Sequence, residues 1–170
     1  MSSAFLKNEP ADDPVVIPAR APLPPGMINY VTPHGLTLLR DELTELESER
    51  ATVSAGALEE RDRSRQLAEL NGRIGLLNQR IATAKVVEEH PALDEVRFGA
   101  TVTLKPRPGK TNLPERKLNI VGVDEADANH GLIAFTAPIV RTMQGKRVGD
   151  PVTVPTRTGS ITLVIAAIDY

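Results

Sequence analysis

The side chains best suited to chemistry lie in one short stretch, ALEERDRS, at residues 57–64. Glu59, Glu60 and Asp62 place three carboxylates within four positions, and Arg61 lies between them. Carboxylates so close in sequence could bind Mg²⁺, which takes oxygen ligands and keeps several of its waters. Guanidinium groups among them could instead pair with the carboxylates and repel a cation. The stretch is therefore either part of a metal site or a solvated or protein-contacting turn.

Other groups that could bind a metal or a polyanion are weaker candidates. His34, His90 and His130 are far apart in sequence, and each is better explained as a capping, turn or surface residue. The chain has no cysteine, which excludes disulfides and thiolate metal sites. Basic residues flank one Pro/Gly-rich stretch and could form a patch facing RNA or an acidic protein, although solubility explains them as well. These residues are Lys105, Arg107, Lys110, Arg116 and Lys117.

Two amphipathic segments must position the acidic stretch. Thr32-Pro33 is a favourable helix start, with Thr as N-cap and Pro at the first helical position. Apolar residues then recur in alternating steps of three and four, which is a coiled-coil pattern. The first arm has Leu36, Leu39, Leu43, Leu46 and Val53, and the second has Leu67, Leu70, Ile74, Leu77, Ile81 and Ala84. The numbers of opposing residues add to a constant, so residues 29–90 are predicted to form an antiparallel hairpin about 40 Å long with its tip near 57–64.

The apolar period changes to about two after residue 90. Five segments alternate in this way and predict four or five short strands, and Pro138 to Gln144 is predicted to form one short helix closed by Gly145. Residues 91–170 are therefore expected to form a small, mainly antiparallel sheet with one helix, which makes the whole chain an α+β protein. The predicted core residues are Phe98, Leu104, Leu118, Ile120, Ile133, Phe135, Ile139, Met143, Leu163 and Ile165.

The N-terminal 28 residues and the overall composition limit the partners and the location. Half of the fourteen prolines precede residue 34, so residues 1–28 are predicted to be a disordered tail, with a docking peptide as the alternative. A net charge of -2 and 3% aromatic residues argue against a nucleic-acid-binding surface of the usual basic kind. No run is long and apolar enough to span a membrane, and no export signal is evident, so a cytoplasmic location is expected.

Several strings resemble the bacterial Gre factors, GreA and GreB, over residues 29–170. NYVTPHGLTLLRDELTEL is similar to the opening of their hairpin, and RIATAKVVE is similar to its base. VRFGATVTL, IVGVDEAD, APIVRTMQGKRVGDPVTV and IAAIDY resemble their FKBP-like C-terminal domain. The resemblance implies that the C-terminal domain docks at the secondary channel of RNA polymerase, with Arg141, Lys146, Arg147 and Asp150 as the docking candidates.

The resemblance also implies a role for the tip, Glu59 to Asp62, close to the catalytic centre and the nascent RNA or DNA of the polymerase. In family members that stimulate RNA cleavage, acidic tip residues help to hold a second Mg²⁺ beside the polymerase's own metal, and two metals stabilise an in-line displacement at phosphorus. The protein would then need no cofactor of its own, because this Mg²⁺ is shared with the polymerase.

The tip departs from the family's Gly-Asp-x-x-Glu-Asn pattern. Glu59 and Asp62 have the spacing of three but the reverse order, and arginines are interleaved with them. The arms are also roughly six residues shorter than is usual, which is about 9 Å of helix. We therefore expect a monomeric regulator of elongation without efficient transcript cleavage. The alternatives are an active cleavage factor, a regulator of the nucleoside diphosphate kinase type, a coiled-coil adaptor or swapped dimer, and a peptidyl-prolyl isomerase.

Overall fold

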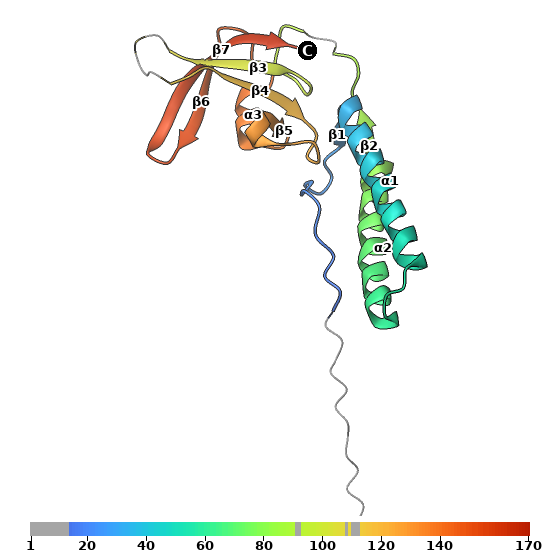
Figure 1. Ribbon diagram of the computed structural model, residues 1–170. Helices are drawn as coiled ribbons and strands as arrows, with labels where there is room; N and C mark the ends of the chain where they lie inside the picture. Colours follow the sequence, from blue (N-terminus) through green and yellow to red (C-terminus); the bar gives the residue numbers. More distant parts are fainter. Residues whose placement is uncertain (1–13, 91–92, 108, 110–112) are drawn as a thin grey trace, which may run out of the picture.

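The chain forms a helical hairpin that projects from a small sheet domain (Figure 1). The computed structural model describes residues 14–90, 93–107, 109 and 113–170. Helix α1 (Pro33–Ala55) and helix α2 (Glu60–Ala82) are antiparallel, and the loop 56–59 joins them. At 1.5 Å per residue, 23 residues make each arm about 34 Å long, which is shorter than the predicted 40 Å.

The predicted helix start is confirmed, and so is the predicted seam except for Leu67, which is half-buried and lies outside the cluster. The hydroxyl of Thr32 accepts a hydrogen bond from the Gly35 amide at 2.8 Å, and Pro33 occupies the first helical position. The apolar residues of the two arms meet in one hydrophobic cluster, whose members come from the arms and from the base of the hairpin. Its members are Val31, Leu39, Leu46, Leu70, Ile74 and Leu77, with Leu36, Leu43, Val53, Ile81, Ala84 and Val86 packed around them.

A short parallel ladder, absent from the sequence-based prediction, closes the base of the hairpin. Strand β1 (Asn29–Val31) pairs with β2 (Ala84–Val86), and the Val87 amide extends the ladder to the carbonyl of Val31 at 3.0 Å. Buried Asn29 donates to the Arg80 carbonyl at 2.9 Å, so the entrance to α1 is tied to the end of α2. Three-residue strands are too short for an alternating pattern to reveal them.

The sheet domain has five strands in the order β5-β4-β3-β7-β6. They are β3 (Thr101–Pro106), β4 (Arg116–Val121), β5 (Leu132–Ala134), β6 (Pro151–Thr156) and β7 (Gly159–Asp169). The pairs are antiparallel except for β4 with β5, which is parallel because the chain crosses over through the 3-10 turn η1 (Ala128–His130). The prediction of a mainly antiparallel sheet holds with that one exception.

Helix α3 (Pro138–Met143) packs against the sheet and encloses the core of this domain (Figure 1). The core contains all ten residues predicted from the sequence, of which Leu104, Ile120, Met143, Leu163 and Ile165 are buried and the other five are half-buried. Within the described ranges, no helix is long and apolar enough to cross a bilayer.

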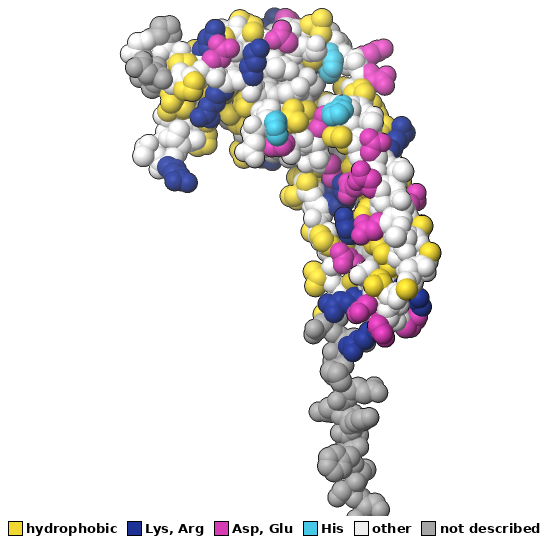
Figure 2. Space-filling model, viewed as in Figure 1, with side chains coloured by type: hydrophobic (Ala, Val, Ile, Leu, Met, Phe, Trp, Pro, Cys, Tyr) yellow, Lys and Arg dark blue, Asp and Glu magenta, His cyan; other side chains and the backbone are white. Residues whose placement is uncertain are grey.

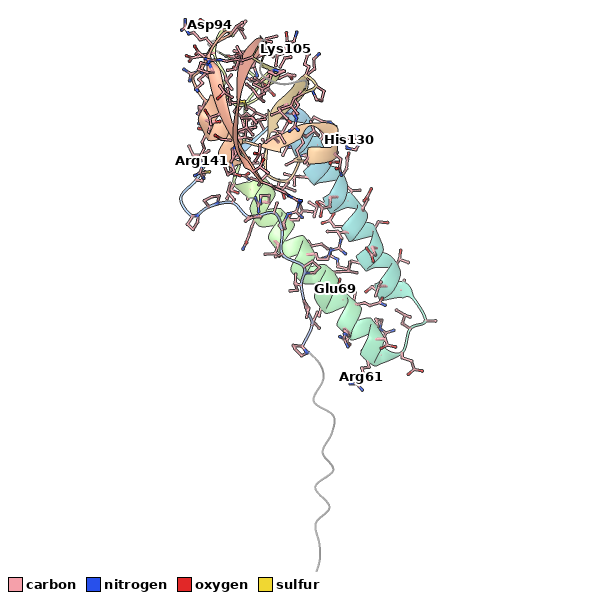
Figure 3. The ribbon with its side chains drawn as sticks, turned by 90° about the vertical axis from the view of Figure 1, so that its left-hand side faces the viewer. Arg61, Glu69, Asp94, Lys105, His130 and Arg141 are labelled. Atoms are coloured by element: carbon pink, nitrogen blue, oxygen red, sulfur yellow. The ribbon has the colours of Figure 1, made fainter. Side chains whose placement is uncertain are left out.

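The N-terminal segment requires a correction to the expected disordered tail. Residues 1–13 lie outside the described residues. Residues 14–28 form no helix or strand, as their prolines dictate, but they lie along the hairpin beside α2 (Figures 1 and 3). Ile17 sits against Gly72 of α2, where an added Cβ would lie only 2.1 Å from the Cδ1 of Ile17. Residues 14–28 are called the strap below.

Candidate functional site

The tip of the hairpin is tighter than the sequence suggests. Helix α2 begins at Glu60, so Glu60, Arg61 and Asp62 occupy its first turn rather than a loop, and only residues 56–59 connect the helices. Negative charge is favourable at a helix N-terminus because the unpaired amides there carry partial positive charge. The acidic residues of the stretch thus have a structural role as helix starters, independent of any metal.

The charges at the tip are partly neutralised within the tip itself. The carboxylate of Glu60 pairs with the Arg63 guanidinium on the same turn, and Ser64 Oγ lies 3.5 Å from the other carboxylate oxygen. Figure 2 shows acidic and basic side chains mixed over this end of the hairpin, and Figure 3 shows Arg61 at its far end. Among the described residues, no three His, Cys, Asp or Glu side chains converge as metal ligands.

The loop 144–150, which follows α3, is held rigid by its own hydrogen bonds. The Asp150 carboxylate accepts from the Arg147 amide at 2.8 Å, and the Asp150 amide donates to the Arg147 carbonyl at 3.0 Å. Gly145 and Gly149 supply the positive φ angles, 74° and 95°, that this tight turn needs. Asp150 therefore shapes the loop, and its role in docking stays a prediction.

The remaining docking candidates have different environments. The Lys146 ammonium donates to the Pro151 carbonyl, and Arg147 pairs with Asp94 at 3.0 Å. Arg141 is exposed on α3, at the edge of the sheet domain (Figure 3). Val148, which the sequence reasoning missed, is 58% exposed in the loop. An apolar side chain between Arg147 and Gly149 in a turn was the signal available in the sequence, because most turn positions are polar.

The histidines have separate environments in the structure, and so do the basic residues around the Pro/Gly-rich stretch. The His130 ring lies 2.7 Å from the Asp127 carboxylate in η1, and this hydrogen bond holds the pKa of Asp127 below its usual value. His34 is exposed in the first turn of α1, whereas His90 stacks on Tyr170 with ring centroids 4.3 Å apart. Lys105 pairs with Glu115 at 3.1 Å. Arg107, Arg116 and Lys117 are exposed, and Lys110 lies outside the described residues.

Aromatic rings, which a prolyl pocket would need, gather in one cluster between the base of the hairpin and the sheet domain. The ring of Tyr30, from β1, lies 5.7 Å from both Phe98 and Phe135, which are themselves 5.6 Å apart. The cavity beside these rings measures about 60 Å³. Ligand pockets are usually several hundred Å³, so this one is too small for a peptidyl-prolyl substrate. Tyr30 instead ties the base of the hairpin to the sheet domain.

Comparison with known proteins places these features in a family. Residues 90–170 match the family model described as "Transcription elongation factor, GreA/GreB, C-term". The chain is 34% identical over 157 residues to transcription elongation factor GreB of Neisseria meningitidis, covering 84% of this chain and 94% of that protein. It is 32% identical over 154 residues to GreB of Pseudomonas aeruginosa, covering 82% and 89%. It is 32% identical over 155 residues to GreA of Francisella tularensis, covering 82% and 95%.

Solved structures give a weaker similarity. The GreA factor homologue Gfh1 of Thermus thermophilus matches with 18% identity and a TM-score of 0.39, covering 85% of this chain and all of that one. A score this low carries no argument, so the assignment rests on sequence identity over most of the chain. This chain belongs to the GreA/GreB family of transcription elongation factors.

Proposed function

We propose that the protein binds RNA polymerase through its sheet domain, inserts the hairpin toward the catalytic centre, and regulates elongation without stimulating efficient transcript cleavage. Family membership supports the polymerase as partner. The observation that carries the finer proposal is the tip, where a carboxylate is paired with Arg63 on its own turn and Arg61 lies between the remaining acids. A cation-binding role requires carboxylates that converge and are not paired with arginine.

The length of the hairpin supports the same conclusion. Arms of 23 residues reach about 34 Å, and Mg²⁺ ligation tolerates errors of only a few tenths of an Å. The resemblance to the Gre factors implies arms roughly six residues longer than these, which is about 9 Å of helix. A tip that falls short of the metal can occupy the channel but cannot complete the second metal site.

Active cleavage remains the second candidate because of two specific side chains. Glu59 and Asp62 are exposed, and within the described part of the chain neither carboxylate takes part in a salt bridge. They lie three residues apart across the start of α2. If the protein docked more deeply than its relatives, these two carboxylates would be the ones that approach the polymerase metal.

The deciding experiment uses a backtracked elongation complex with radiolabelled RNA. We expect no shortening of the RNA beyond the polymerase's intrinsic rate, together with inhibition of cleavage when an active Gre factor competes for the channel. RNA shortening that is lost in Glu59→Ala or Asp62→Ala would establish the cleavage reading instead. Glu47→Ala, which removes an exposed carboxylate midway along α1, is the matched control and should behave as wild type in either case.

Docking is tested separately from cleavage. Val148→Asp places a charge on the exposed apolar residue of the loop 144–150 and should weaken binding to core polymerase at least tenfold, which corresponds to about 1.4 kcal/mol. Thr158→Asp adds the same charge to an exposed position in the turn between β6 and β7 and should leave binding unchanged. Equal affinities for the two variants would show that the loop is not the docking surface.

A further inference from the structure

The strap brings one arginine into contact with both parts of the molecule. Arg20 donates from its Nη atoms to the Glu42 carboxylate of α1 at 2.8 and 3.0 Å. It also donates to Asp124 Oδ1, from Nε at 3.1 Å and from Nη2 at 2.9 Å. Asp124 belongs to the sheet domain, in the connection that follows β4, so a single guanidinium links the strap, the hairpin and the sheet domain.

This cluster is largely shielded from solvent. The side chains of Arg20, Arg80 and Asp124 are 17%, 13% and 10% exposed. Arg80 of α2 lies 3.3 Å from Asp124 Oδ2, but neither of these two atoms forms a well-aligned hydrogen bond within the described residues. Arg80 is directed instead to the strap, where it donates to the Ala21 carbonyl at 2.6 Å. Arg20 is therefore the residue whose aligned hydrogen bonds hold Asp124 against the hairpin.

A second side-chain contact between the sheet domain and the base of the hairpin lies nearby. Glu125, next to Asp124, accepts a hydrogen bond from the Thr32 hydroxyl at 2.5 Å, at the N-terminus of α1. These two carboxylate contacts add to the packing of Tyr30 against Phe98 and Phe135. Together the contacts restrict rotation of the hairpin about its base. The contact through Asp124 depends on Arg20, because α1 and α2 supply only a partly exposed Glu42 and the poorly aligned Arg80.

From this geometry we propose that Arg20 is a positioning residue, through which the strap fixes the direction of the hairpin relative to the sheet domain. Direction matters because the hairpin is a lever. For a rod about 34 Å long, a tilt of about 10° at the base moves the tip by about 6 Å. The proposal deepens the proposed function, since a docked sheet domain can deliver the tip to a fixed place only if this angle is fixed. It concerns the free protein, so it can be tested without polymerase.

The absence of cysteine from the sequence permits a direct measurement. Gln66→Cys on α2 and Thr158→Cys in the turn between β6 and β7 are exposed positions for two spin labels, and pulsed electron spin resonance reports the distance distribution between them. We expect one narrow distribution in the otherwise wild-type chain. Arg20→Ala should broaden or shift it, and Arg20→Lys, which keeps the charge but not the forked donors, should restore it in part.

The controls separate positioning from general loss of structure. Arg65→Ala removes an exposed arginine from α2 and should leave the distance distribution unchanged. Helical circular dichroism should be the same for all variants, because Arg20 belongs to neither hydrophobic cluster. In the Asp124→Ala background, which removes the acceptor, adding Arg20→Ala should have little further effect on the distribution. An unchanged distribution in Arg20→Ala would overturn the proposal, and so would a change that persists at full size in the Asp124→Ala background.

A failure of polymerase binding would not affect these distances. Conversely, if Arg20→Ala leaves the distances unchanged while the competition assay succeeds, the proposed function stands and the positioning role of the strap is wrong. If the distances change as expected, the same variant should also compete less well with an active Gre factor.

Discussion

Gly35 offers a sharp test of how the sheet domain grips the hairpin. It lies in the first turn of α1, and a Cβ added there would lie 2.6 Å from Glu125 Oε2 and 3.3 Å from Thr32 Oγ1. The carboxylate is the end of a flexible side chain and can rotate away. The cost of Gly35→Ala is therefore the hydrogen bond that Glu125 would abandon, rather than a permanent overlap.

Two opposing terms set the sign of the effect. A hydrogen bond to a charged group contributes about 1.5–3 kcal/mol, and its half-buried position favours about 1.5. Replacing Gly by Ala within a helix gains about 1 kcal/mol at most, and less in the first turn. Gly35→Ala should thus destabilise the wild-type chain by about 0.5–1 kcal/mol. When Glu125→Ala has already removed the carboxylate, the same change should become stabilising.

The assay is urea unfolding followed by far-ultraviolet circular dichroism, which is dominated by the helices of the hairpin. The double-mutant cycle of Gly35→Ala and Glu125→Ala should give a coupling energy of about 1.5 kcal/mol, well above the additivity error of about 0.5 kcal/mol. The tight approach to Thr32 Oγ1 is present in both backgrounds and cancels. A Gly35→Ala effect of the same sign and size in both backgrounds would refute the assigned contact.

Three further predictions concern the strap, the C-terminus and the seam. The hydrogen bond from Arg20 holds the pKa of Glu42 below its ordinary value of 4.5. The stability that the ionised Glu42 contributes is therefore present above pH 4.5 and is lost as pH falls through the lower folded-state pKa. Acidification should lower the urea midpoint of wild type more than that of Glu42→Gln. Burial raises the pKa of Tyr170, whose hydroxyl donates to the Glu95 carbonyl at 2.6 Å and accepts from the Arg97 amide at 3.1 Å. Tyr170→Phe should therefore destabilise the sheet domain by about 1–2 kcal/mol in thermal unfolding. An unchanged melting temperature would count against those two hydrogen bonds. Leu77→Ala, at a fully buried seam position, should cost about 2–5 kcal/mol in urea unfolding, whereas Leu38→Ala, on the exposed face of α1, should cost about 0.5 kcal/mol or less.

The sequence was most informative where a local period reports a buried face. Steps of three and four between apolar residues predicted both arms of the hairpin, because a helix must bury one stripe, and Leu39 and Leu77 now lie in the same cluster. Alternation in the C-terminal half predicted four or five strands, where the sheet has five, and it predicted core residues that are confirmed. The tip stretch was placed correctly at the end of the hairpin, although Glu60 to Asp62 start a helix rather than form a turn.

Contacts between distant segments were outside the reach of such patterns. Arg20 and Asp124 are 104 residues apart, and nothing in a proline-rich stretch indicates that one of its arginines is needed by a loop of another domain. Tyr30 was not expected to pack between Phe98 and Phe135, nor β4 to pair in parallel with β5. Periodicity fixes which face of an element is buried, but not which partner covers it. The sequence by itself determined three helices, the strands of the C-terminal sheet and a charged tip. The tertiary structure alone decided how the strap and the hairpin base join the hairpin to the sheet domain, because that depends on pairings between groups with no sequence relation.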